Sequence, residues 1–296
     1  MKLGFLYAGQ GSQHPGMGAD LYDAYPAFRA VLDSAEVDFD LKEVCFTDSQ
    51  GLINQTRYTQ PCMVAFAAGL TAVLRQKGIV PTVAAGLSLG EYSALHAAGV
   101  FDAATAVKLV AFRGKAMEEA AAGRESAMMA VLNLDRAPLQ EACDAASDLG
   151  CVVIANYNCP GQLVISGAVE AVDAACEKAK AAGARRALRL PVGGAFHSPL
   201  MEPAKQELEK AIAEAPFQTP VCPVYQNVDA KPYTDPAAIK ANLIAQLTAP
   251  VRWTYIVRNM LSDGVTEFTE LGPGSVLQGL IRKVDPNAVV ESKSTL

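Results

Sequence analysis

The sequence predicts an α/β protein in which a small domain is inserted into a larger one. A Gly-x-Ser-x-Gly motif lies between a short apolar segment typical of a buried strand and a segment typical of a helix. From residue 124 the order of predicted elements becomes strand-helix-strand-strand-helix-strand, the ferredoxin-like arrangement. We therefore expect a large α/β domain of residues 1–123 and 194–296 and a small domain of residues 124–193.

Composition sets the broad class. The 296 residues are 51% apolar, which is enough to bury a core, and a net charge of −6 without a long basic run argues against binding to nucleic acid or a membrane surface. Seven cysteines without a Cys-x-x-Cys motif or a nearby histidine predict reduced thiols, no metal site and a cytoplasmic protein. The apolar run at the N-terminus is too short for a signal peptide, and no segment is long enough to span a membrane.

The first part of the chain is expected to form a strand and two helices around a glycine-rich loop. Leu3–Ala8 has the pattern of a buried strand, and the loop Gly9–Gly18 that follows indicates a close approach of backbone to another group. The loop fits neither the dinucleotide-binding spacing nor a Walker motif. Asp20–Ser34 predicts a helix, and Gln60–Arg75 predicts a strongly apolar helix with Pro61 in its first turn.

Ser88 is the central residue of the Gly-x-Ser-x-Gly motif, between the predicted strand Thr82–Ala85 and the predicted helix Glu91–Ala98. In a nucleophile elbow of this kind, a strained turn presents the serine hydroxyl at a helix N-terminus. An oxyanion formed there would meet free backbone N–H groups, beginning with that of Leu89. A tight turn with a capping serine is the alternative.

Arg113 has an unusual position on the next predicted helix, Asp102–Ala122. Leu109, Arg113 and Met117 follow one another at intervals of four, so the arginine stem lies on the apolar face. The residues three and four positions away include no carboxylate. A desolvated guanidinium needs an anion from elsewhere, although extension to the surface or pairing with a distant acid stays open.

The small domain is predicted to contain six elements, with Cys159-Pro-Gly161 as a hairpin turn. These elements are Ala127–Leu134, Pro138–Ser147, Cys151–Asn158, Gln162–Ser166, Val169–Ala182 and Ala184–Val192. Basic residues with no acid between them gather near its end: Lys178, Lys180, Arg185, Arg186 and Arg189. Such a stretch either docks an acidic partner or is an ordinary solvated helix end.

The last part of the chain returns to the large domain. A glycine-preceded junction, Gly193–Met201, contains His197 beside a Ser-Pro helix start. The elements expected beyond it are the helix Glu202–Ala215, the strand Cys222–Val228, the helix Asp235–Leu247 and the segment Val265–Ser275, a strand entering a Gly-Pro-Gly loop before a last helix.

A serine nucleophile needs a general base, and the chain has three histidines. His96 follows Ser88 by eight residues on the elbow helix, about 12 Å along its axis, and cannot reach back that far. His14 lies in the glycine-rich loop beside a proline, whereas His197 lies at a junction between domains, where clefts form. We therefore favour His197, whose orienting partner could be a backbone carbonyl because no local acid is marked.

The spaced motifs together resemble the malonyl-CoA:acyl carrier protein transacylase family over essentially the whole chain. They are Gly9-Gln-Gly-Ser-Gln, Gly-x-Ser-Leu-Gly-Glu-Tyr-Ser-Ala around Ser88, Arg113, Gly-Ala-Phe-His-Ser-Pro around His197, Gln246 and the Gly-Pro-Gly at 272–274. The family usually has histidine immediately before the nucleophile, where this chain has Leu87, so a contribution of that ring to the pocket is not expected here.

The resemblance implies an α/β-hydrolase-like large domain and a role for each matching residue. Ser88 would be the nucleophile, His197 its base and Arg113 the ligand of the malonyl carboxylate. The backbone N–H groups of Gln10 and Leu89 would form the oxyanion hole, and the Gln246 carbonyl would orient the histidine. The Ala-Phe-His triplet, which contains Phe196, resembles the form associated with malonyl selection.

The implied reaction is ping-pong transfer of malonyl from malonyl-CoA to the phosphopantetheine thiol of acyl carrier protein for fatty acid synthesis, by a monomer without metal or redox cofactor. The resemblance does not fix the surface on which the carrier docks; if the basic residues from Lys178 to Arg189 dock an acidic partner, that partner would be the carrier. An α/β-hydrolase-type esterase or thioesterase is the rival, but it should have its histidine near the C-terminus, whereas 99 residues follow His197. A non-catalytic carrier-binding module is a second alternative.

Overall fold

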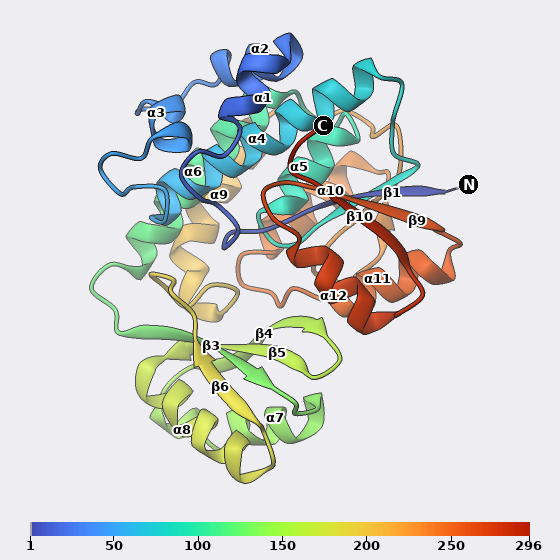
Figure 1. The fold of residues 1–296 in the computed structure, drawn as a ribbon. Helices are drawn as coiled ribbons and strands as arrows, with labels where there is room; N and C mark the ends of the chain where they lie inside the picture. Colours follow the sequence, from blue (N-terminus) through green and yellow to red (C-terminus); the bar gives the residue numbers. More distant parts are fainter. Residues whose placement is uncertain (1) are drawn as a thin grey trace.

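The computed structural model describes residues 2–296 and contains two β-sheets with helices packed on them (Figure 1). The larger sheet has the order β10-β9-β1-β2-β7-β8, and the smaller has the order β4-β5-β3-β6. The strands of the larger sheet are β1 (Leu3–Tyr7), β2 (Val83–Gly86), β7 (Val224–Tyr225), β8 (Pro232–Tyr233), β9 (Glu267–Leu271) and β10 (Val289–Lys293). Those of the smaller sheet are β3 (Ser126–Leu132), β4 (Val152–Cys159), β5 (Gln162–Ala168) and β6 (Arg186–Arg189).

The larger sheet is parallel except for β8, which pairs antiparallel with β7. Its central strands are short apolar runs buried on both faces, as expected when helices cover a parallel sheet. Tyr7 at the end of β1 pairs with Gly86 at the end of β2. The glycine-rich loop after β1 and the serine turn after β2 therefore leave the sheet side by side, at the carboxyl edge where ligands bind in such folds.

The smaller sheet is antiparallel, and its elements follow the predicted ferredoxin-like order. Helices α7 (Arg136–Asp144) and α8 (Val169–Ala181) cover one face and share a core with it. The opposite face places Met128, Ala130 and Val164 in the main hydrophobic core, and Figure 1 shows this face turned toward the larger part of the molecule. The exact boundaries at residues 124 and 193 stay a prediction.

Ten further α-helices are described, and all of them lie before β3 or after β6 in the chain. They are α1 (Ala19–Ala24), α2 (Pro26–Asp33), α3 (Leu41–Phe46), α4 (Thr56–Gln76), α5 (Gly90–Ala97), α6 (Ala103–Ala121), α9 (Glu202–Glu214), α10 (Pro236–Ala245), α11 (Trp253–Ser262) and α12 (Val276–Val284). Short 3₁₀ turns occupy Ser147–Leu149 and Pro199–Met201.

Three predicted elements differ from the structure. The helix expected over Asp20–Ser34 is two helices, because Pro26 disfavours helical geometry at the preceding residue and Tyr25 is extended. Helix α4 begins four residues before Gln60, so Pro61 lies inside the helix rather than in its first turn. The strand expected over Cys222–Val228 shrinks to β7, because the Asn227 N–H donates to the Glu91 carboxylate instead of a neighbouring strand. Strands β8 and β10 and helices α3 and α11 were not predicted.

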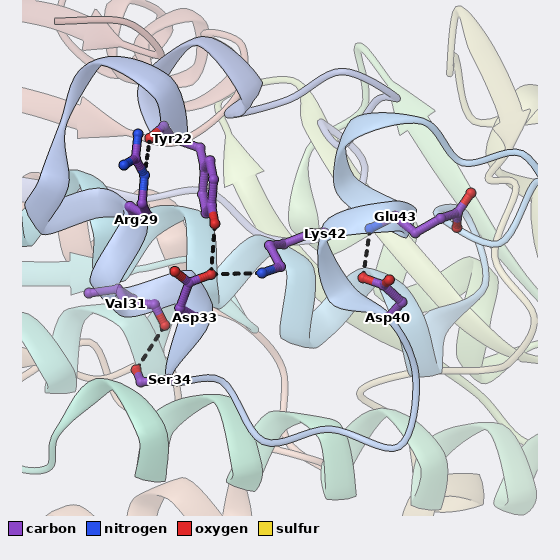
Figure 2. Close-up of polar contacts among 8 residues, drawn as sticks. All are labelled: Tyr22, Arg29, Val31, Asp33, Ser34, Asp40, Lys42 and Glu43. Carbon is purple, nitrogen blue, oxygen red and sulfur yellow. Dashed lines mark hydrogen bonds and ion pairs between the residues drawn. The ribbon is translucent and has the colours of Figure 1, made fainter.

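The three N-terminal helices are joined by surface polar contacts (Figure 2). The Tyr22 hydroxyl and the Lys42 ammonium both donate to Asp33, at 2.8 and 2.7 Å, and Asp40 caps α3 through the Glu43 N–H. The hydrogen bond from Lys42 lowers the pKa of the exposed Asp33 carboxyl. Exposed pairs of this kind contribute little stability, so these contacts orient α1, α2 and α3 rather than hold the fold.

Candidate active site

Ser88 lies in a sharp turn between β2 and α5. Its φ of 52° falls in the left-handed region, which costs a non-glycine residue about 1–3 kcal/mol. The flanking glycines make the turn sterically accessible: a Cβ on Gly86 would lie 1.9 Å from the Gly90 carbonyl carbon, and one on Gly90 would lie 2.0 Å from the Tyr7 oxygen. Ser88 therefore has the backbone geometry of a nucleophile elbow.

The structure brings Ser88 and His197 together from positions 109 residues apart. Ser88 Oγ lies 2.7 Å from His197 Nε2, and His197 Nδ1 lies 3.0 Å from the Gln246 carbonyl oxygen. Because that carbonyl can only accept, Nδ1 carries the proton and Nε2 is left to accept from the serine hydroxyl. Nucleophile, base and orienting group thus form a connected chain in which a backbone carbonyl takes the place of a carboxylate.

His197 is buried, and its surroundings keep it neutral. Burial, followed by the positive charge of Arg113, lowers the pKa of His197 to about 4. The ring is therefore unprotonated at neutral pH and able to accept a proton from Ser88.

Arg113 points from α6 into the same place and has no acidic partner. Its guanidinium donates to Gln60 Oε1 at 2.9 Å, to Gln246 Oε1 at 3.1 Å and to Ser88 Oγ at 3.2 Å. It is 1% exposed, burial lowers its pKa, and within the part of the chain described no Asp or Glu lies within ion-pair distance of it. The Nε group has no hydrogen-bond partner. A buried cation held only by neutral groups is suited to bind an anion.

Two backbone N–H groups at the carboxyl edge of the larger sheet, those of Gln10 and Leu89, are free among the residues described. Neither makes a hydrogen bond with any residue in the range 2–296, whereas the Ser88 N–H is bonded to Asn227. Gln10 follows β1 and Leu89 follows β2, so the pairing of these two strands brings both N–H groups to the same edge. This arrangement can receive negative charge on an oxygen bound at Ser88.

A cavity of 270 Å³ opens at these groups. Its lining residues come from the large part of the chain, including Val276 and Leu280 of α12, and from the smaller sheet. The lining residues that the sequence singled out are Gln10, Leu87, Ser88, Leu89, Arg113, Phe196 and His197. A larger hollow of 540 Å³ lies between α6 and α9, but none of these groups lines it.

The other candidate residues lie elsewhere. His14 is exposed in its loop, and His96 is buried with Nδ1 3.1 Å from the Phe101 carbonyl oxygen. The five basic residues from Lys178 to Arg189 are all exposed, on α8 and on or beside the edge strand β6. Leu190, the residue after β6, lines the cavity and is separated from Arg186 by an even number of positions along the extended chain.

Sequence reasoning missed four polar residues around Ser88: Gln60, Glu91, Gln226 and Asn227. Gln60 is a polar side chain on an apolar helix face, so the argument used for Arg113 could have found it. Glu91 is fully buried, and burial raises its pKa to about 7 against the opposing effect of hydrogen bonds from Asn227 and Gln226. No local sequence pattern marks Asn227 as a residue of the site.

Residues 2–296 include neither a metal-binding cluster nor a helix that could span a membrane. No group of three or more His, Cys, Asp or Glu within residues 2–296 is placed to hold a metal ion. None of the helices that the structure describes combines the length and apolar character needed to cross a membrane. All seven cysteines are free thiols, and six are buried.

The fold and the site define an acyl-transfer protein of the α/β-hydrolase-like class. A sequence profile described as the acyl transferase domain matches residues 4–292. The chain belongs to this acyltransferase family, which confirms the resemblance noted from the motifs and the predicted fold class.

Individual relatives are similar over nearly their full length. The malonyl CoA-acyl carrier protein transacylase of Bacillus subtilis (strain 168) is 41% identical, with 96% of this chain and 90% of that protein aligned. The structure of an acyl carrier protein S-malonyltransferase from Vibrio cholerae has a TM-score of 0.97 and 40% identity, covering 100% of this chain and 98% of that one. A malonyl-transacylase solved in complex with a type II PKS acyl-carrier protein has a TM-score of 0.96 and 37% identity, covering 100% and 97%.

We expect Arg113→Ala to raise the pKa of His197 from about 4, while leaving it below 6.5 because the ring stays buried. Arg113→Lys retains the charge and should leave that pKa low. Nitrogen NMR titration of the three histidines measures the values directly. Equal values in the two variants would show that the charge at position 113 does not act on His197.

Proposed function

We propose that this chain transfers a malonyl group from malonyl-CoA to the phosphopantetheine thiol of acyl carrier protein, in the cytoplasm and for fatty acid synthesis. The observation that carries the proposal is the Ser88–His197 hydrogen bond beside a buried arginine without an acidic partner. The names of the relatives support the same donor and acceptor.

In the first half-reaction, Ser88 Oγ attacks the thioester carbonyl carbon and its proton passes to His197 Nε2. The carbonyl oxygen becomes an oxyanion that accepts hydrogen bonds from the N–H groups of Leu89 and Gln10. The C–S bond then breaks, and His197 returns the proton to the coenzyme A sulfur. The products are malonyl-Ser88 and free coenzyme A.

The second half-reaction repeats these steps with the thiol of the carrier. His197 takes the thiol proton, the sulfur attacks the ester carbonyl of malonyl-Ser88, and the oxyanion occupies the same N–H groups. Collapse breaks the C–Oγ bond, and His197 reprotonates Ser88. The protons pass only between the Ser88 hydroxyl, His197 and the two thiols, so we propose no cofactor.

Arg113 is proposed to bind the free malonyl carboxylate. A guanidinium can donate two parallel hydrogen bonds to a carboxylate, and the substrate would supply the anion that the protein does not. Phe196 lines the same cavity and would pack against the acyl group. The esterase alternative is disfavoured, because a neutral ester has no group that needs a buried cation.

We expect Ser88→Ala to form no covalent malonyl adduct and His197→Ala to form it far more slowly, since Ser88 needs a base to become nucleophilic. His14→Ala and His96→Ala are matched controls and should acylate normally. Intact mass after mixing with malonyl-CoA measures the adduct. An adduct that survives in Ser88→Ala would refute the nucleophile, and a wild-type chain without one would refute the proposed function.

Arg113→Ala should lower kcat/KM for malonyl-CoA. The loss should correspond to several kcal/mol of transition-state stabilisation, because one partner of a buried charge pair is removed. Acetyl transfer does not use that pair and should be spared or improved, which inverts the preference. Arg113→Lys should recover only part of the malonyl activity. A parallel fall for malonyl-CoA and acetyl-CoA would instead show that Arg113 is structural.

The carrier is proposed to dock near Lys178, Lys180, Arg185, Arg186 and Arg189. Reversing the charge of Arg185 and Arg186 should raise the KM for the carrier and weaken the salt dependence of transfer, because oppositely charged surfaces steer association. Acylation by malonyl-CoA should not change. Lys210→Glu, an exposed charge on α9, is the control, and an equal effect there would argue against a local docking site.

A further inference from the structure

The left-handed backbone of Ser88 needs groups that hold it. Gly86 and Gly90 make the turn possible but exert no force that keeps it formed, since neither has a side chain. Strained residues persist only when their surroundings fix them. The relevant contacts are therefore those made by the Ser88 backbone.

Both polar groups of that backbone are bonded to distant side chains. The Ser88 N–H donates to Asn227 Oδ1 at 2.6 Å, and the Ser88 carbonyl accepts from Gln246 Nε2 at 3.0 Å. The same Asn227 side chain donates from Nδ2 to the Gly86 carbonyl at 2.7 Å. One carboxamide thus spans the turn, with a bond on each side of Leu87.

The orientation of the Asn227 carboxamide follows from its partners. The Ser88 N–H can only donate and the Gly86 carbonyl can only accept, so Oδ1 must face the first and Nδ2 the second. Asn227 is fully buried and does not line the cavity. It can influence a substrate only through the turn that it holds.

Glu91 fixes Asn227 in turn. Its Oε2 accepts the Asn227 N–H at 2.6 Å, and its Oε1 accepts from Gln226 Nε2 at 3.1 Å. Glu91 has no ion-pair partner among residues 2–296 and lies in the first turn of α5, where the helix dipole favours a negative group. Through these two hydrogen bonds, the buried Glu91 side chain links α5, the helix that follows Ser88, to the loop that carries Asn227.

We propose that Asn227, oriented by Glu91, is a positioning residue that sets the Ser88 turn for acyl transfer. The inference rests on the proposed role of Ser88 as nucleophile. Asn227 occupies the Ser88 N–H, which leaves the Leu89 N–H free for the oxyanion, and it fixes the backbone from which Oγ reaches His197 Nε2. Neither Asn227 nor Glu91 touches the reacting atoms.

The first test compares Asn227→Ala with Asn259→Ala in single-turnover acylation by malonyl-CoA, measured by quenching and intact mass. Asn259 is a matched control because its carboxamide also donates to a backbone carbonyl, that of Ala230 at 2.9 Å, outside the cavity. The maximal acylation rate of Asn227→Ala should fall about 100-fold, as for a misplaced reacting group. The half-saturating malonyl-CoA concentration should change less than about threefold, because binding contacts are intact. Asn259→Ala should keep the wild-type rate.

Conservative variants keep the test valid if Asn227→Ala does not fold. Asn227→Asp retains an acceptor for the Ser88 N–H but sets an oxygen against the Gly86 carbonyl, so its rate should lie between wild type and alanine. Glu91→Gln retains a carbonyl acceptor for the Asn227 N–H and should recover part of the rate lost in Glu91→Ala. Thermal unfolding of every variant separates stability from positioning.

The inference is overturned if Asn227→Ala or Asn227→Asp acylates at the wild-type maximal rate, or if Asn259→Ala slows acylation as much as Asn227→Ala. It is also overturned if the half-saturating concentration rises while the maximal rate is kept, since that pattern marks a binding contact. A wild-type chain that forms no malonyl-Ser88 would instead refute the proposed function, so the two failures are distinguishable.

Discussion

The site depends on the close backbone packing of the first turn of α5 against the ends of β1 and β2. Hydrogens on Gly86 and Gly90 are all that fits there, because a Cβ at either position would overlap backbone atoms of Gly90 or Tyr7. This close packing permits the chain to reverse within a few residues, with Ser88 at a φ of 52°, and hydrogen bonds with Asn227 and Gln246 hold the turn. The serine hydroxyl, the free N–H of Leu89 and the start of α5 are placed by that single turn.

Two buried ionisable side chains, Glu91 and Arg113, lie beside the turn, and their hydrogen-bonding partners differ. Glu91 is satisfied by donors from the protein itself, whereas Arg113 is held by neutral acceptors and keeps an unpartnered Nε. Burying a charge is expensive unless its hydrogen-bonding groups are matched. The hydrogen-bonding groups of Glu91 are therefore matched within the protein, whereas the Arg113 guanidinium keeps an N–H group free among residues 2–296. Under the proposed function, the malonyl carboxylate would supply that missing partner, and the stability of the bound state would depend on the charge of the substrate.

The sequence was informative where function leaves a local pattern. Ser88 lies in a glycine-spaced motif, Arg113 interrupts the apolar face of a helix, and the four strands and two helices around the smaller sheet follow one another in the predicted order. Asn227 and the brevity of β7 could not be predicted, because both follow from a contact with Glu91 across 136 residues. The division of the predicted helix Asp20–Ser34 into α1 and α2 could have been predicted from Pro26. The helical periodicity on both sides of the proline instead favoured one continuous helix.

The same charge that would bind the malonyl carboxylate also acts on the base. Burial is the larger cause of the low pKa of His197, and the positive charge of Arg113 is the second. The Arg113 guanidinium also donates a hydrogen bond to Ser88 Oγ. A carboxylate paired with the guanidinium would offset that charge and raise the basicity of His197 where the proton must be accepted. An uncharged acyl group would occupy the cavity without this effect. Discrimination between acyl groups would then arise in the proton-transfer step as well as in binding, through one arginine placed beside both members of the dyad.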